Sequence, residues 1–272
     1  MFPSNLHTHT IYSDGASTAE EYIKKAINLG FTSIGFSEHS STVYQCSAEI
    51  LPQNIDSYIS EINQLKEKYK NQIEILLGFE EDIYGPVDRS SLDFVIGAVH
   101  YLQTPQNKNK YISVDHNPGY FEELIQAFGS IENVCKEYYR MVSQVIATKP
   151  DILAHFDLLT KFNGDVENHY FDPHADWYKN LVNNVCDDLK NTGIIVEINT
   201  GAISRGYRTT PYPSDYILKK LHQNQIPITI SADAHQDLHI NFAFDQAIHI
   251  AKNIGYTSVK LWKNGGFIDY NL

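Results

Sequence analysis

The sequence predicts a single α/β domain, a barrel of parallel strands with its functional site at their carboxyl ends. Three observations predict it. Short apolar runs alternate with helix-like segments from one end of the chain to the other. The chain has 272 residues with 42% hydrophobic content, which is enough for one large core. Histidines and carboxylates follow the apolar runs, where barrel enzymes carry their functional residues.

Eight apolar runs have the length and the flanking turn residues of β-strands. They are Asn5–Thr8, Ser33–Ser37, Ile73–Phe79, Phe94–Val99, Ile152–His155, Ile194–Ile198, Ile228–Ser231 and Ser258–Leu261. Repeated βα units over this length imply a parallel sheet, and seven or eight of them imply that the sheet closes into a barrel.

Helical patterns fill the intervals between the apolar runs. The first helix has a cap at Ser17 or Thr18, and Gly30, Gly193 and Gly255 stand where a left-handed residue is expected to end a helix. The six predicted helices are Thr18–Leu29, Asn54–Tyr69, Tyr120–Thr148, His174–Asn191, Ser214–Gln223 and Asn241–Asn253.

Six of the predicted units carry a possible metal ligand at or just beyond the end of the strand. Residues with structural roles alone would be scattered over both rims and the helices. Imidazole nitrogens and carboxylate oxygens bind zinc, manganese and iron, and one carboxylate can bridge two ions. The sequence therefore predicts a multinuclear metal site of the kind found in hydrolases. Its candidate ligands are His7, His9, Asp14, His39, Glu80, His100, His155, Asp233 and His235.

The segment His7-Thr8-His9 places two imidazoles on the same side of a strand, where both can reach one ion. An isolated motif of this kind is more often a pair of half-exposed strand histidines than a metal pair. Here it is followed by Asp14 and, much later, by the sequence SADAH at residues 231–235, which supplies two further ligands at one strand end.

Two connections on the predicted functional rim are long. They follow the second and the fourth strands, at Ser40–Gln53 and Leu102–Gly119. Long loops on such a rim usually cover or select the substrate. The chain shows no internal repeat and no linker, so one domain over residues 1–272 is expected.

Charge and cysteine content exclude several classes of protein. A net charge of −12 disfavours a nucleic-acid partner and favours a small substrate, although bound divalent ions would attract phosphate locally. Cys46, Cys135 and Cys186 form neither a disulfide framework nor a thiolate zinc motif. There is no apolar run of about 18 residues and no signal-peptide pattern. We expect a soluble, cytoplasmic protein, and the sequence leaves its oligomeric state open.

The motifs together resemble those of the PHP (polymerase and histidinol phosphatase) metal-dependent phosphoesterases. The matching segments cover nearly the whole chain in order: HTHTIYSDG at 7–15, FSEHS at 36–40, GFEED at 78–82, GAVH at 97–100, LAHFD at 153–157, EINTGAISRG at 197–206 and SADAH at 231–235. The resemblance is closest to the histidinol-phosphatase branch, because the EINTGAISRG motif with its arginine, the chain length and the long rim loops are similar there. It implies a distorted (β/α)7 barrel with a trinuclear site, and eight apolar runs fit seven barrel strands plus one outlier.

The resemblance also implies which residues share each of three divalent ions, whether zinc, manganese or iron. It assigns the first ion to His7, His9, Glu80 and Asp233. It assigns the second to Glu80, as a bridge, with His100 and His155, and the third to Asp14, His39 and His235. The position of Asp14 varies within the family. Every other ligand position holds a competent residue, which argues against a metal-free homologue.

The chemistry expected of such a site is attack of a metal-bridging hydroxide on phosphorus. Glu80, Asp233 and His235 are the predicted catalytic residues, and Asp233 or a histidine beside a metal is a candidate proton shuttle to the leaving alkoxide. Arg205 is the candidate phosphate clamp, since a guanidinium can contact two phosphate oxygens, and Arg208 is a weaker candidate. The alternative for Arg205 is a solvated loop arginine.

If the substrate is L-histidinol phosphate, its ammonium and imidazole groups need anions and hydrogen-bond acceptors on the rim. Candidates for this role are Glu81, Asp82, Asp115 and Asn199, and a tyrosine that stacks on the imidazole could be Tyr44, Tyr101 or Tyr207. The remaining histidines fall in predicted loops or helices and are interpreted as non-ligands: His116, His169, His174, His222, His239 and His249.

The first hypothesis is therefore a phosphatase that hydrolyses L-histidinol phosphate to L-histidinol and phosphate, a reaction of histidine biosynthesis. The alternative within enzymes is a PHP phosphoesterase acting on another small phosphomonoester or a nucleotide, because a metal site reads the phosphate and not the leaving group. An oligonucleotide exonuclease is disfavoured by the acidic composition. A non-catalytic metal-binding barrel would require lost ligands.

Overall fold

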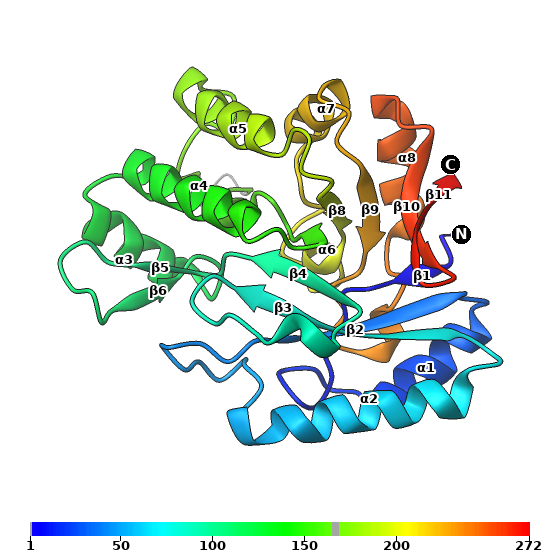
Figure 1. The fold of residues 1–272 in the computed structure, drawn as a ribbon. Coiled ribbons are helices and arrows are strands. Elements are labelled where there is room, and N and C mark those ends of the chain that lie inside the picture. Colours follow the sequence, from blue (N-terminus) through cyan, green and yellow to red (C-terminus); the bar gives the residue numbers. More distant parts are fainter. Residues whose placement is uncertain (1, 165–168) are drawn as a thin grey trace.

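A computed structural model describes residues 2–164 and 169–272 of the chain. Seven parallel strands form its central sheet, in the order β1-β2-β3-β4-β7-β8-β9 (Figure 1). They are β1 (Ser4–Asn5), β2 (Ser33–His39), β3 (Glu74–Asp82), β4 (Phe94–Ala98), β7 (Ile152–Leu153), β8 (Ile195–Asn199) and β9 (Ile228–Ser231). This sheet confirms the predicted α/β barrel of seven strands.

The sheet closes just beyond the ends of β1 and β9. Thr8 and Ala234 form a parallel bridge there. The amide of His9 donates to the carbonyl of Ala234 at 2.9 Å, and the amide of Ala234 donates to the carbonyl of His7 at 3.1 Å. The first strand is thus shorter than predicted, yet its continuation holds both histidines at the carboxyl end of the barrel.

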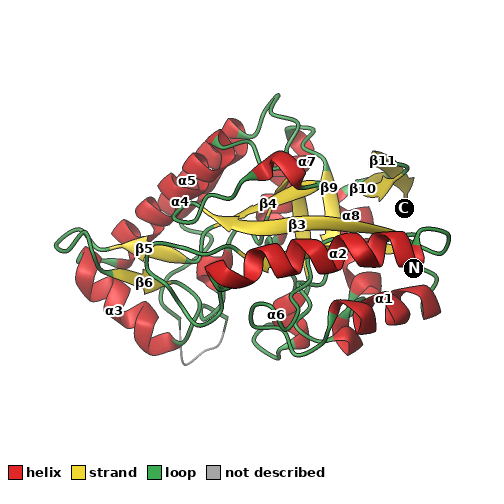
Figure 2. Ribbon diagram, turned by 60° about the horizontal axis from the view of Figure 1, so that its bottom comes forward, coloured by secondary structure: helices red, strands yellow, loops and turns green. Residues whose placement is uncertain are grey.

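Helices enclose the strands on the outside (Figure 2). α1 packs on β2, α2 on β3, α4 on β4 and α8 on β9. The helices are α1 (Ala19–Asn28), α2 (Ile55–Tyr69), α3 (Pro118–Phe128), α4 (Ile131–Ala147), α5 (Asp176–Asp188), α6 (Gly201–Ser204), α7 (Asp215–Gln223) and α8 (Phe244–Ile254). At α1 the Thr18 side chain accepts from the Glu21 amide and the Glu21 side chain accepts from the Thr18 amide, which confirms the predicted cap.

The prediction of one helix over Tyr120–Thr148 is wrong, because two helices, α3 and α4, occupy this segment. Gly129 ends α3 in the left-handed region with φ 79°. The side chain of Ser130 then caps α4 by accepting from the amide of Asn133. Apolar periodicity continues across the break, so only the glycine and serine pair marks it in the sequence.

The barrel interior is apolar at its amino-terminal end and polar at its carboxyl end. Phe94 fills the apolar half, where it needs the bare backbone of Gly78: a Cβ at Gly78 would lie 2.6 Å from the phenylalanine ring. A separate antiparallel hairpin, β10 (Ser258–Lys263) with β11 (Gly266–Asn271), packs Trp262 and Phe267 against this core. The predicted run Ser258–Leu261 is therefore a strand outside the barrel, the outlier among the eight.

The long connection after β4 contains regular structure that the sequence analysis did not predict. Within Leu102–Gly119, β6 (Tyr111–Ser113) pairs antiparallel with β5 (Tyr101–Gln103). Together with the connection after β2, this hairpin stands above the carboxyl ends of the barrel strands and forms one wall of the site described below. None of the helices within residues 2–164 and 169–272 is long and apolar enough to cross a bilayer.

Candidate active site

The nine predicted ligands converge at the carboxyl end of the barrel, with Glu80 of β3 at their centre. Both carboxylate oxygens of Glu80 face imidazole nitrogens. Oε2 lies 2.8 Å from Nδ1 of His39, 3.3 Å from Nε2 of His7 and 3.5 Å from Nε2 of His9. Oε1 lies 2.9 Å from Nε2 of His155 and 3.3 Å from Nε2 of His100. One carboxylate therefore joins two sets of histidines, as a bridging ligand would.

Asp233 faces the imidazole rings of His7 and His9. Its Oδ1 lies 3.3 Å from Nε2 of His9 and 3.7 Å from Nε2 of His7. Asp233 adopts the left-handed backbone region with φ 46°, a conformation that often marks functional sites. Gly201 permits this approach, because a Cβ there would lie 2.9 Å from the carboxylate of Asp233.

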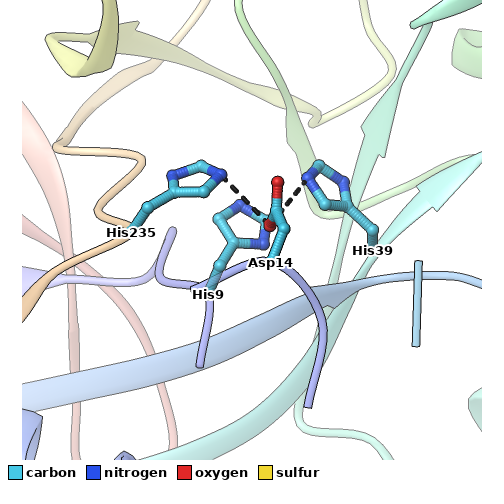
Figure 3. A group of neighbouring side chains, drawn as sticks. All are labelled: His9, Asp14, His39 and His235. Atoms are coloured by element: carbon cyan, nitrogen blue, oxygen red, sulfur yellow. Dashed lines mark ion pairs between the residues drawn. The ribbon is translucent and has the colours of Figure 1, made fainter. Parts of the chain in front are cut away.

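A third group gathers around Asp14 (Figure 3). The side chains of His9, Asp14, His39 and His235 point toward one another from the segment after β1, the end of β2 and the segment after β9. Oδ1 of Asp14 lies 3.2 Å from Nε2 of His235 and 3.6 Å from Nε2 of His39. The rings of His9 and His39 are stacked with centroids 4.2 Å apart. Residues from three separate strand ends thus offer four ligand atoms to one position.

The buried polar atoms of this site fit metal ions. Nε2 of His7, both ring nitrogens of His9 and Oε2 of Glu80 are buried without a hydrogen-bond partner. Such atoms cost stability unless something satisfies them. Burial and the rings of His39 and His235 lower the pKa of His9 to about 3, so this imidazole is neutral with a lone pair available. A neutral imidazole beside an unpaired carboxylate oxygen of Glu80 is a donor set that zinc, manganese or iron takes.

The charges of the site also favour cations. Burial alone would lower the pKa of His7, but the carboxylates of Glu197, Glu80 and Asp233 raise it well above its ordinary value. Burial likewise opposes ionisation of Glu80, yet the surrounding imidazoles hold its pKa well below the ordinary range. The buried carboxylates therefore stay ionised and attract positive charge, whether it is a proton on His7 or a metal ion.

Glu197 of β8 supports the ligands, and the sequence analysis gave it no role. Its carboxylate is fully buried. Oε2 accepts from Nδ1 of His7 at 2.9 Å, and Oε1 accepts from the amide of His155 at 2.7 Å. The bond to Nδ1 directs the other nitrogen of His7 toward Glu80 and Asp233. The signal in the sequence was a lone carboxylate within an apolar strand, which indicates a buried and partnered charge.

Glu197→Gln is expected to weaken metal binding about tenfold to a hundredfold while the fold remains. The amide oxygen can still accept from His7, but the negative charge that holds the imidazole is lost. Metal titration of the metal-free protein measures the change. An unchanged metal affinity would contradict the supporting role of Glu197.

Above the ligands lies a cavity of about 340 Å³. Its floor contains Glu80, His155 and Asp233, and its walls come from the connection after β2 and from the β5–β6 hairpin. The predicted role of the two long connections in covering the site agrees with this arrangement.

Six predicted substrate contacts line the cavity, whereas Glu81 and Asn199 do not. Arg205, Asp115 and Asp82 line it, as do Tyr44, Tyr101 and Tyr207. Glu81 does not, because it points away from Glu80 and its Oε1 pairs with Arg89 at 2.5 Å. Asn199 is buried, where its amide donates to Glu197 at 2.7 Å and to Asp233 at 3.4 Å. Neither Glu81 nor Asn199 is among the residues that line the cavity, and their substrate contacts stay predictions.

Other cavity residues differ from the sequence-based interpretation. His116, interpreted from the sequence as a non-ligand, lines the cavity but belongs to none of the groups of candidate ligands among the described residues. Lys161, which was not predicted, also lines it and donates to the carbonyl of Asp115 at 2.7 Å and to its Oδ2 at 3.2 Å. Arg208 instead donates to Thr160 and is not among the cavity residues. No sequence signal marked Lys161, because its position depends on the loop after β7.

Comparison with known proteins decides the family. The sequence profile of the PHP domain matches residues 5–201. The chain belongs to the PHP domain family. The chain is 30% identical over 268 residues to the histidinol-phosphatase of Bacillus subtilis (strain 168). The alignment covers 88% of this chain and 96% of the relative. The resemblance inferred from the motifs is thereby confirmed.

The fold of this PHP domain also has a close counterpart among solved structures. It superposes with a TM-score of 0.74 on the crystal structure of histidinol phosphate phosphatase from Lactococcus lactis complexed with zinc, L-histidinol and phosphate. The two chains are 20% identical, and the superposition covers 98% of each. The similarity confirms the distorted barrel over the full length.

Proposed function

We propose that this PHP domain is a metal-dependent phosphomonoesterase that hydrolyses L-histidinol phosphate to L-histidinol and phosphate. The observation that carries the proposal is the convergence of nine candidate metal ligands at the carboxyl end of the barrel, seven of which line one small cavity. The leaving group is inferred from the Bacillus subtilis relative, whose name states that it is a histidinol-phosphatase. A histidinol-phosphatase would act in histidine biosynthesis, in the cytoplasm.

We place three divalent ions, whether zinc, manganese or iron, on this floor. The two oxygens of Glu80 support two of the positions, since Oε2 faces His7 and His9 while Oε1 faces His100 and His155. Asp233 completes the first position. The group of Asp14, His39 and His235 supports the third. When bound, such ions supply a water of lowered pKa as the nucleophile and neutralise the phosphate charge.

The protein contributes charge and position to the reaction. Arg205 and Lys161 are cations on the cavity wall, placed to contact phosphate oxygens that point away from the floor. Burial alone would raise the pKa of Asp233, but Arg205 and His7 hold it well below the ordinary range. So low a pKa makes Asp233 a weak base, and Asp233 or a histidine beside the metal positions is the candidate to carry a proton to the leaving alkoxide. His235, on the same segment, borders the cavity beside it.

Asp115 is the candidate contact for the ammonium group of the substrate. It lines the cavity, and the effect of its burial is outweighed by Lys161, His100 and His155, which lower its pKa to about 2. It is therefore anionic at neutral pH. The rings of Tyr44 and Tyr101, with centroids 4.2 Å apart, form an aromatic wall that an imidazole can pack against.

Asp115→Asn is expected to raise KM for L-histidinol phosphate about tenfold. It is expected to change kcat/KM for an aryl phosphate that has no ammonium group less than about twofold. The amide keeps the shape but lacks the charge that attracts ammonium. Steady-state kinetics with both substrates measure the difference. Glu123→Gln, on the exposed ion pair with Lys110, is the matched control. Equal losses on both substrates would remove Asp115 from leaving-group recognition.

The test of the proposal is product analysis with the metal-free protein reloaded with zinc, manganese or iron in ¹⁸O-labelled water. L-Histidinol and inorganic phosphate are expected in equal amounts, with the label in the phosphate, because the water attacks phosphorus. Release of phosphate only from other monoesters would show that L-histidinol phosphate is not the substrate. Label in the alcohol would contradict attack at phosphorus.

A further inference from the structure

Glu38 is a buried carboxylate beside the candidate metal centre but outside the ligand set. It precedes His39 on β2, so its side chain leaves the strand on the face opposite to that histidine. The residue is completely buried. An ionised carboxylate in such a place is costly unless hydrogen bonds compensate it. Its partners therefore indicate what the residue holds in place.

Within residues 2–164 and 169–272, the donors to the Glu38 carboxylate all come from one turn, residues 10–15, which follows β1. The amide of Thr10 lies 3.0 Å from Oε1 and 3.1 Å from Oε2. The hydroxyl of Thr10 donates to Oε1 at 2.7 Å, and the hydroxyl of Ser13 donates to Oε2. The turn cannot move away from β2 without leaving this buried charge unpaired.

The same turn is closed tightly on its other side. The amides of Ser13 and Gly15 donate to the carbonyl of Thr10 at 3.1 Å and 3.0 Å. A Cβ at Gly15 would lie 2.0 Å from the carbonyl oxygen of His9, so only glycine fits here. Backbone hydrogen bonds and the carboxylate of Glu38 thus constrain the conformation of this turn from both sides.

This turn carries Asp14 into the third group of ligands (Figure 3). The carboxylate of Asp14 meets His39 and His235 at 3.6 Å and 3.2 Å, and its side chain is one-third exposed. Asp14 reaches the site from a surface turn, whereas Glu80 and His39 are held by the sheet itself. Its placement consequently depends on whatever fixes the turn.

We propose that Glu38 is a positioning residue for Asp14 and that it sets the metal affinity of the third position. The inference rests on the proposed metal centre. Glu38 acts by holding Thr10 and Ser13 and not by contact with the carboxylate of Asp14. The held turn presents the Asp14 carboxylate to His39 and His235. Asp14 therefore loses little conformational freedom when an ion binds.

Glu38→Gln is the test, with calorimetric zinc titration of the metal-free protein and metal analysis of the loaded protein as readouts. The amide retains the volume but places an NH₂ group against donors. One zinc equivalent is expected to bind about tenfold to a hundredfold more weakly, while the other two are unchanged. Asp14→Asn should weaken the same equivalent, and the double variant should be no weaker than Asp14→Asn alone, because both act on one group.

Two further variants keep the test decisive if Glu38→Gln folds poorly. Ser13→Ala removes one donor from the partly exposed turn and should weaken the same equivalent by a smaller factor. Glu49→Gln is the matched control, because Glu49 is a buried carboxylate that holds a different turn through Thr42 and the amide of Cys46, without a predicted ligand. It should leave all zinc equivalents unchanged.

The outcomes separate the positioning role from the metal centre itself. Absence of a third zinc equivalent in the unsubstituted protein would overturn the proposed centre. A third equivalent that Glu38→Gln and Ser13→Ala bind as tightly as the unsubstituted protein would overturn only the role of Glu38. Strictly additive effects of Glu38→Gln and Asp14→Asn would also overturn it, because Glu38 would then act elsewhere.

Discussion

Glu80→Gln is expected to lower kcat/KM on the order of a thousandfold or more and to reduce the metal content of the protein. The two oxygens of Glu80 approach five imidazoles from opposite sides, between 2.8 and 3.5 Å. A neutral amide offers one weak acceptor and one donor in their place, so it cannot join two ions. Kinetics with L-histidinol phosphate and metal analysis of the same sample measure both effects.

The control for Glu80→Gln is its neighbour on β3. Glu81→Gln removes a carboxylate of the same size that faces away from the site and pairs with Arg89. It is expected to lower thermal stability and to change kcat/KM less than about threefold, because its pair is partly buried and outside the cavity. Retention of activity and full metal content by Glu80→Gln would refute its bridging position.

Arg205→Ala is expected to have the second largest effect, a loss of about a hundredfold in kcat/KM. The guanidinium donates to Oδ2 of Asp233 at 3.0 Å and to its carbonyl at 3.1 Å, and its other contact is Nδ1 of His235 at 2.9 Å. Alanine removes a cation from the phosphate and also releases two candidate ligands. Loss of the phosphate contact should raise KM, and release of Asp233 and His235 should lower metal affinity.

Arg205→Lys separates the two contributions. Lysine keeps the charge but cannot hold Asp233 and His235 in the same planar geometry, so KM should recover more than metal affinity does. Arg208→Ala is the control, since that guanidinium donates to Thr160 and not to the cavity. If Arg205→Ala left KM for the phosphomonoester unchanged, Arg205 would have no place in the phosphate site.

The convergence of the candidate ligands could be predicted from the sequence because it depends on strand ends. In a parallel barrel the carboxyl ends of all strands meet on one rim, so residues at those ends come together whatever the loops do. Glu80, His155 and Asp233 illustrate this, for they come from β3 and from the segments after β7 and β9, yet line one floor.

Two of the predicted substrate contacts, Glu81 and Asn199, do not line the cavity, and strand geometry explains part of this difference. Glu81 follows Glu80 directly, and successive side chains of a strand point to opposite faces, so only one of them can face the site. Asn199 lies on the inner face, but its side-chain amide donates to Glu197 and Asp233. Position near a strand end therefore did not suffice; the direction of the side chain decides.

The walls of the cavity depend on loop conformation, which apolar periodicity does not encode. His116 and Lys161 reach the cavity through the segments after β6 and β7. The β5–β6 hairpin was hidden because its strands have three residues each. Glu38 and Glu197 were overlooked for a different reason, since their function is to hold other residues and only their partners reveal it.

The substrate preference is measured by kcat/KM for phosphate release from L-histidinol phosphate, aryl phosphates and nucleotides with the metal-loaded protein. The cavity and its candidate contacts predict a preference of a thousandfold or more for L-histidinol phosphate, about 4 kcal/mol of transition-state discrimination. Equal, low rates on every substrate would contradict the proposed leaving group while leaving phosphoesterase chemistry in place. An absence of phosphate release from all of them would contradict the account as a whole.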